Sequence, residues 1–159
     1  IEEMKMVLDI YGQLDSKVDE TARLIQECVS DINPPLLSIT GIGIDSAAVI
    51  LAEFGDFSKF QNANQLLSFA GMEPGYFQSG TSETTGKMVK HGSSYLRYTL
   101  MNCARSVVNY EPTFAEYYAK KRAEGKNYRV ALSHTVKKLV RVIFTLQTKN
   151  LVYDSDALR

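Results

Sequence analysis

The stretch Ile39-Thr40-Gly41-Ile42-Gly43 lies between two apolar segments whose composition is typical of helices. Its pattern, hydrophobic-x-Gly-hydrophobic-Gly, is that of the turn in a helix-hairpin-helix motif. Gly41 and Gly43 allow a ligand to approach the backbone closely, and the following helix begins with N–H groups that are free to bind an anion. A nucleic-acid phosphate is the anion that this arrangement favours. The alternative is an ordinary turn between two helices, which would look the same.

The charge of the chain is unevenly distributed. The sequence has 159 residues, is 45% hydrophobic and has a net charge of zero, which predicts one folded core with room for an extended segment. Residues 1–60 carry 11 acidic and 4 basic side chains, whereas residues 61–159 carry 7 acidic and 14 basic ones. Between residues 79 and 149, 13 basic side chains stand against 4 acidic ones. This excess favours a surface that faces phosphate over an ordinary solvated helix face.

The cysteines and the chain ends indicate the cellular compartment. Cys28 and Cys103 are far apart and belong to no CxxC or Cys/His cluster, which argues for a reducing compartment and against structural zinc. We find no apolar run long enough to span a membrane and no signal peptide, so a cytoplasmic protein without membrane contact is expected. The sequence begins at Ile1 without a methionine, which indicates a fragment of a longer protein.

Residues 1–33 are expected to form a coiled-coil segment. Apolar or small residues recur there at alternating intervals of three and four: Met4, Val7, Tyr11, Leu14, Val18, Thr21, Ile25, Cys28 and Ile32. Such a heptad pattern predicts one helix of ~45 Å that pairs with another helix. The alternative is a long helix packed against its own domain. Pro35 ends the helix, because the residue before a proline avoids the helical conformation.

Residues 34–153 are expected to form a compact, mostly α domain. Its first long helix is predicted over residues 45–55, with Asp45 as N-cap and Gly55 at the C-terminal end. Further helices are predicted over residues 62–70, 93–109, 112–124 and 128–147. Between Met72 and Gly92 the sequence is rich in Gly, Ser and Thr and predicts a long loop, with a small strand pair as the alternative.

This loop carries the candidate chemistry. Ser79 lies beside a glycine, where its hydroxyl would be exposed enough to reach a substrate. Lys87, Lys90 and Arg97 follow closely, and such cations can bind a phosphodiester and stabilise an oxyanion. His91 is the only imidazole near the serine in sequence. The plain alternative is that Ser79 is an ordinary turn residue.

The order and spacing of several short motifs add to this interpretation. They are Ile39-Thr40-Gly41-Ile42-Gly43, Phe57-Ser58-Lys59-Phe60, Gly71-Met72-Glu73-Pro74, Gln78-Ser79-Gly80, Lys90-His91-Gly92-Ser93 and Leu96-Arg97. Together they resemble the C-terminal domain of the insertion-sequence transposases of the IS-one-ten family, relatives of the pilin-gene invertase. The resemblance runs from about Leu36 to Val108, with similar helical sequence towards Tyr153. One departure is Thr40, where the family more often has proline.

The resemblance implies site-specific DNA recombination directed by a bridge RNA. It implies that Ser79 is the nucleophile, which forms a covalent phosphoserine link to DNA; Ser82 and Ser93 are the local rivals, and Ser93 is better interpreted as a helix cap. DNA, the guide RNA and further copies of the chain, as a dimer or an assembled tetramer, are the implied partners. Lys87, Lys90 and Arg97 are assigned to phosphate by charge and position.

The resemblance also implies a RuvC-like N-terminal domain that is absent from this chain. That domain would hold the acidic site for Mg²⁺. Asp45, Glu53 and Asp56 are spaced as a cap and surface charges, so we predict no metal or other cofactor in this chain. The chain alone is then expected to bind nucleic acid without cutting it.

Two other functions remain open from the residues. One is a non-catalytic helix-hairpin-helix module that binds DNA and oligomerises, in which Ser79 has no special role. The other is an assembly module, in which residues 2–32 drive association and the rest is scaffold. Binding to several phosphates would weaken steeply with salt, whereas a scaffold predicts no such response.

Overall fold

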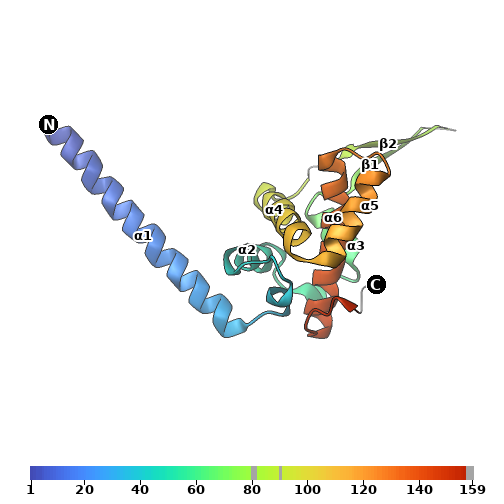
Figure 1. The fold of residues 1–159 in the computed structure, drawn as a ribbon. Coiled ribbons are helices and arrows are strands. Elements are labelled where there is room, and N and C mark those ends of the chain that lie inside the picture. The colour runs from blue at the N-terminus through green and yellow to red at the C-terminus, as the bar shows by residue number, and fades with distance from the viewer. Residues whose placement is uncertain (80–81, 90, 157–159) are drawn as a thin grey trace.

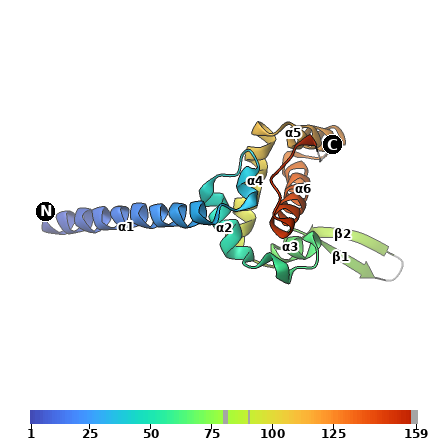
Figure 2. The same ribbon diagram turned by 90° about the horizontal axis from the view of Figure 1, so that it is seen from below.

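A long helix, a helical body and a two-stranded hairpin make up the chain, and the helix and the hairpin project from the body in different directions (Figure 1 and Figure 2). The computed structural model describes residues 1–79, 82–89 and 91–156, with residues 74–79 and 82–87 described by their backbone. The predicted mostly α fold is confirmed. No helix in these ranges has the length and apolar composition needed to cross a membrane.

The long helix α1 (Glu2–Ile32) stands away from the body. It ends at Asn33, whose backbone is left-handed (φ 43°) and whose N–H donates to the Val29 carbonyl, before two prolines that cannot continue the helix. Val29 is the one buried residue of α1. Six heptad residues expose between 41 and 68% of their surface: Met4, Val7, Tyr11, Leu14, Val18 and Ile25. The alternative of a helix packed along its own domain is therefore wrong.

The predicted helix-hairpin-helix turn joins a short 3-10 helix to an α-helix. The 3-10 helix η1 (Pro35–Ser38) is followed by α2 (Ile44–Phe54), so the first arm of the hairpin is only a single turn. Gly43, not Asp45, is the N-cap of α2, because the Gly43 carbonyl already accepts from the Ala47 N–H at 2.9 Å. Asp45 lies in the first turn of the helix. The predicted C-terminal end at Gly55 is confirmed.

The helical body is built around α6 (Tyr128–Lys149). This helix contacts α3 (Ala63–Phe69), α4 (Ser94–Tyr110), α5 (Pro112–Ala123) and the short helices η1 and η2 (Phe57–Lys59). Its buried side chains repeat at helical spacing and include Leu132, Val136, Leu139, Val140 and Ile143. The four predicted helices of the body are thus confirmed, with ends that differ by one or two residues.

Four phenylalanines hold α2, η2 and α3 together. Phe54, Phe57, Phe60 and Phe69 form ring pairs with centroids 5.6–6.1 Å apart, in tilted or edge-on arrangements. Aromatic pairs of this geometry add to the stability from burial alone. Phe69 is the last residue of α3, so this cluster also supports the point where the hairpin begins.

The segment predicted as a long loop contains an antiparallel hairpin. Strands β1 (Pro74–Ser79) and β2 (Ser82–Met88) pair in the register Tyr76↔Thr85 and Phe77↔Thr84, with an irregularity between residues 74 and 76. The loop prediction is therefore wrong over most of this stretch, and the alternative of a strand pair is confirmed. The pairing sets aromatic residues opposite β-branched ones, which favours a sheet. Glycine and serine in the same segment weaken that signal in the sequence.

The base of the hairpin, where the chain leaves and re-enters the body, is formed by backbone contacts at Gly71 and Gly92. A Cβ on Gly71 would lie 2.8 Å from the Val89 carbonyl oxygen and would overlap that of His91. A Cβ on Gly92 would overlap the Phe69 carbonyl oxygen. Both glycines have positive φ, 64° and 115°. Only glycine fits both the space and the backbone conformation at these two positions.

We predict that Gly71→Ala lowers the free energy of unfolding more than Gly125→Ala does. Gly125 also has a positive φ (79°), but nothing lies within 4 Å of its Cβ position, so alanine there costs only about 1–2 kcal/mol of backbone strain. Gly71→Ala adds the steric overlap, worth about 1–3 kcal/mol more. Urea denaturation measures both values. Equal losses in the two variants would contradict the contact described here.

Candidate nucleic-acid interface

The hairpin carries Ser79 away from the helical body. Ser79 is the last residue of β1 and pairs with Ser82, the first residue of β2, so both lie at the end of the hairpin that is remote from the helices (Figure 2). The two serines that the sequence offered as nucleophile and rival are thus opposite each other. Ser93 has the predicted capping role, since its Oγ accepts from the Leu96 N–H at 3.2 Å.

Two of the predicted cations, Lys87 and Arg97, lie at the other end of the hairpin from Ser79. Lys87 precedes Met88, which pairs with Pro74 at the body end of the hairpin. It is five residues from Ser82 along β2, or about 16 Å at the usual rise of a strand. Lys90 lies outside the described residues. Nearness in sequence had suggested one cluster around Ser79. The structure instead places Ser79 and Lys87 at opposite ends of the hairpin.

Arg97 ties the two ends of the hairpin base together. Its Nη1 donates to the Gly92 carbonyl at 2.9 Å and to the Ala70 carbonyl, at the end of α3, at 3.3 Å. One nitrogen of the guanidinium thus makes hydrogen bonds within the protein. The group has further N–H donors that could bind another acceptor. Arg97 has a structural function at the hairpin base, and its contact with phosphate stays a prediction.

The two glycines of the predicted helix-hairpin-helix turn have different surroundings. Gly41 (φ 104°) faces α4, where a Cβ would meet the backbone of Ser106 and Val107 at 3.0–3.1 Å. The backbone that approaches Gly41 is therefore that of the protein itself. Gly43 is exposed with open space before it, at the start of α2. The role of both residues in phosphate binding stays a prediction.

The acidic residues near the turn serve as surface and capping groups. Asp56 accepts from the Ser58 N–H at 2.9 Å at the start of η2, and the hydrogen bonds from Ser58 lower the pKa of its carboxyl group. Among the residues that the structure describes, no three His, Cys, Asp or Glu side chains are grouped to hold a metal ion. The location of a Mg²⁺ site outside this chain stays a prediction.

Most cations of the basic segment lie on α5, on α6 and in the turn between them, which the site prediction from the sequence did not include. They are Lys120, Lys121, Arg122, Lys126, Arg129, Lys137, Lys138, Arg141 and Lys149. A sequence signal exists, because residues 134, 137, 138 and 141 fall on one face at helical spacing. The packing of α5 against α6 brings cations of both helices together, because Lys121 of α5 and Lys138 of α6 both lie over the Tyr117 ring.

Several curated proteins are similar to this chain. An IS110 insertion-element protein from Streptomyces coelicolor is 32% identical over 124 residues, which are 78% of this chain and 31% of that protein. A transposase for the insertion sequence IS1328 from Yersinia enterocolitica is 25% identical, over 90% of this chain and 44% of its own length. The pilin gene-inverting protein of Moraxella bovis is 27% identical, over 92% and 46%. The chain spans less than half the length of these relatives.

A family comparison covers the part of the chain that carries the turn and the hairpin. The model of the family described as "Transposase IS116/IS110/IS902 family" matches residues 33–119, more than half of the chain. The match includes α2, α3, both strands, α4 and most of α5. This chain therefore belongs to the IS116/IS110/IS902 family of transposases.

Proposed function

We propose that this chain is the serine-bearing part of a DNA transposase, a site-specific recombinase in which Ser79 attacks the scissile phosphate. The position of Ser79 carries the proposal, because the hairpin presents it remote from the helices on a base held by Gly71, Gly92 and Arg97. A reactive group on a projecting element can reach a scissile phosphate that lies at a distance from the helical body. The names of the relatives, transposases and a gene-inverting protein, agree with this chemistry.

The proposed step exchanges one phosphoester bond for another. The Ser79 oxygen forms a bond to phosphorus, and the bond from phosphorus to one sugar oxygen breaks. The serine proton passes to a base, and the leaving oxygen takes up a proton. Because the number of phosphoester bonds is unchanged, the reverse attack by another DNA end rejoins the strands without an energy source.

The remaining parts of the reaction are assigned to the longer protein. His91, the imidazole nearest to the serine in sequence, lies at the hairpin base, remote from Ser79. We assign the base and the Mg²⁺ site to the RuvC-like domain that the family resemblance implies. A bridge RNA would select the DNA sites, and the basic surface of this chain would bind RNA and DNA backbones.

Ser79→Ala in the full-length transposase should abolish the covalent protein–DNA adduct. The reason is that alanine has no oxygen to bond to phosphorus. The measurement is a denaturing gel of the protein with its RNA and a DNA substrate that is nicked to trap the cut end. Ser82→Ala, across the hairpin, is the matched control and should retain the adduct.

Either serine can be identified by this experiment. An adduct that persists in Ser79→Ala and disappears in Ser82→Ala would move the nucleophile to Ser82. Strand cleavage without any adduct in the native protein would count against covalent chemistry in this chain. It would favour the second candidate, a DNA-binding module without catalysis, for which the open helix start at Gly43 is the supporting observation.

The chain of residues 1–159 should bind duplex DNA with an affinity that falls steeply with salt, and should leave the strands intact in Mg²⁺. Each phosphate contact contributes a slope of about −0.9 to the logarithm of the binding constant against that of the salt concentration. Fluorescence anisotropy at several salt concentrations measures the slope, and a gel checks for cleavage. A flat response would favour the scaffold function, and cleavage would contradict the absence of a metal-dependent site.

We also propose that α1 joins copies of the protein through a coiled coil. The apolar heptad residues of α1 are exposed, and the helix carries eight acidic and three basic side chains. Paired copies would bury the apolar stripe and would repel each other by charge. The association should therefore tighten with salt, the opposite of nucleic-acid binding. Dimers and a tetramer in the assembled complex are the expected states.

Val18→Asp should weaken self-association by at least about tenfold, since it places a charge in the apolar stripe that pairing would bury. Sedimentation velocity of the chain over a range of concentrations measures the effect. Ser16→Asp adds the same charge to the same helix, outside the stripe, and is the control. Equal weakening in both variants would show that charge alone, not the stripe, governs association.

A further inference from the structure

The cations of the basic segment gather where α5 and α6 meet. Lys121 comes from α5, Lys126 from the turn after it and Lys137 from α6. Burial, followed by the positive charges of Lys137, Lys126 and Lys121, lowers the pKa of His134. Lysines from three elements are thus close enough to the half-buried His134 for their charges to act on it. We define the cationic seam as these lysines with the two cations that continue it along α6: Lys121, Lys126, Lys137, Lys138 and Arg141.

Little negative charge offsets the seam. Residues 112–149 carry nine basic and two acidic side chains. Glu124 is paired with Lys121 and with Lys126, each at 2.8 Å, and these contacts lower its pKa to about 2. In the part of the chain that the structure describes, the ion pairs of α5, α6 and their turn all involve this one carboxylate. Lys137 and Arg141 are therefore available to an external anion.

Aromatic rings are interleaved with the cations of the seam. The ammonium groups of Lys121 and Lys138 lie 5.5 and 5.1 Å from the ring centre of Tyr117, and Lys138 lies 5.3 Å from that of Phe114. Lys138 also donates to the Thr113 carbonyl at 3.4 Å. These contacts hold Lys138 in place between the two helices. A cation that is already fixed loses less conformational entropy on binding an anion than a mobile one does.

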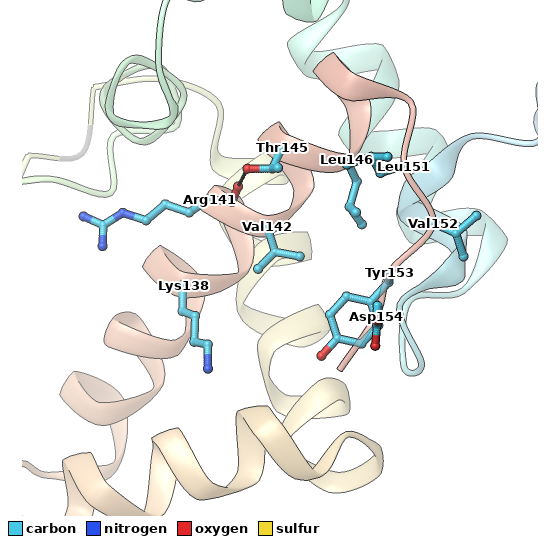
Figure 3. Close-up of a pocket in the computed structure, with 9 residues that line it drawn as sticks. All are labelled: Lys138, Arg141, Val142, Thr145, Leu146, Leu151, Val152, Tyr153 and Asp154. Carbon is cyan, nitrogen blue, oxygen red and sulfur yellow. Dashed lines mark hydrogen bonds between the residues drawn. The ribbon is translucent and has the colours of Figure 1, made fainter. Parts of the chain in front are cut away.

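A cavity opens at the end of the seam. It has a volume of about 390 Å³ and lies between α6 and the C-terminal segment, residues 150–156 (Figure 3). Lys138 and Arg141 are among the residues that line it, and Figure 3 shows the Arg141 side chain directed outward from α6, away from the C-terminal segment. The other residues that line it are Val142, Thr145, Leu146, Leu151, Val152, Tyr153 and Asp154. A largely apolar cavity of this size with a few polar groups is typical of a ligand site.

The far wall of the cavity is held by contacts distant in sequence. The Tyr153 N–H donates to Ser38 Oγ at 2.8 Å, and the Tyr153 ring stacks on Phe114 with centroids 6.3 Å apart. The Leu151 N–H donates to the Leu146 carbonyl at 3.0 Å. Burial, with the nearby Glu111 carboxylate, raises the pKa of Tyr153 to about 12. The wall is therefore preformed, and its tyrosine is uncharged near neutral pH.

We propose that this cavity binds one unstacked base of a single-stranded nucleic acid whose phosphates lie against Lys137, Lys138 and Arg141. The proposal rests on the proposed function, since it assumes that the chain handles nucleic acid. It adds a site that is separate from the hairpin and needs no serine. Asp154 borders the cavity and repels phosphate, so the strand would run from the α6 edge along the seam and not over the C-terminal segment.

A single strand fits these observations better than the alternatives. A base in a duplex must leave its stack to enter a cavity, whereas a base in a single strand is free to do so. An acidic helix, such as α1 of a second copy, would also match the charge of the seam. However, the polar and apolar residues of such a helix lie on one rigid surface. In a nucleic acid, flat and weakly polar bases are attached to an extended line of phosphates. That arrangement matches an apolar cavity at the end of a cationic seam.

The test is a substitution that fills the cavity from its rim. Thr145 is exposed and lines the cavity, and its hydroxyl donates back to the Arg141 carbonyl at 3.0 Å. Thr145→Met should extend a longer side chain into the space that the base would occupy. We expect a loss of about tenfold in affinity for short oligo(dT) and oligo(U), the scale of one lost stacking contact, with duplex affinity unchanged. Anisotropy of labelled oligonucleotides measures all three.

Thr148→Met is the matched control. Thr148 is also exposed on α6 and makes the same kind of back-bond, to the Phe144 carbonyl at 2.6 Å, but it does not line the cavity. It should leave every affinity as it is in the native chain. Comparison of oligo(dT) with oligo(U) shows whether DNA or RNA is the better ligand.

A second pair of variants tests the seam. Arg141→Gln should weaken single-strand binding and reduce its salt slope by about 0.7, the value for one phosphate on a single strand. Lys149→Gln removes the same charge from the same helix outside the cavity and should change the slope less. Equal slopes for the two variants would overturn the placement of phosphate at Arg141.

The other outcomes separate this proposal from the proposed function. If Thr145→Met and Thr148→Met bind single strands equally well, the cavity proposal fails, although the Ser79 adduct can still form. If the chain binds no nucleic acid, both fail. If a peptide of residues 2–32 competes with oligo(U) and binds the native chain more tightly than Thr145→Met, the occupant is an acidic helix of a second copy and the nucleic-acid proposal is overturned.

Discussion

The hairpin that carries Ser79 depends on the backbone contact between its two ends. A two-stranded sheet of this length is marginally stable by itself, so its direction must be set where it meets the body. Gly71 and Gly92 bring the two chain segments together without side chains between them, and Arg97 bridges α3 to Gly92. Because this contact is made by backbone atoms, it leaves little rotational freedom at the base.

The helix α6 has a comparable function for the rest of the body. It packs against α3, α4 and α5, so that one face lies in the core while the other carries cations. The C-terminal segment returns across it and is held by Ser38 and Phe114, residues from opposite ends of the domain. These contacts create the cavity beside Lys138 and Arg141. The basic surface and the cavity are thus consequences of the same packing.

The projecting helix α1 and the helical body have opposite electrostatic properties. The acidic helix α1 exposes an apolar stripe, and association through it would work against the repulsion of like charges. The body has an excess of basic residues, and its proposed binding of nucleic acid would weaken with salt. An acidic arm and a basic body are consistent with one protein that both associates and binds nucleic acid.

Local patterns in the sequence determined the helices, the end of α1 at its prolines, the cap at Ser93 and the excess of positive charge, because each depends on residues within a few positions. The order of short motifs also determined the family. Two predictions from the sequence were wrong. The β-hairpin was expected to be a loop, because glycines interrupt the pattern of its strands, and α2 was expected to have Asp45 as its N-cap, whereas the N-cap is Gly43. Only the tertiary structure decided that Ser79 and Lys87 lie at different ends of the hairpin, that Gly41 faces α4 and that α5 and α6 share one basic seam. The physical reason is that these relations arise from strand pairing and from packing between helices, and a pattern within a few residues does not contain this information.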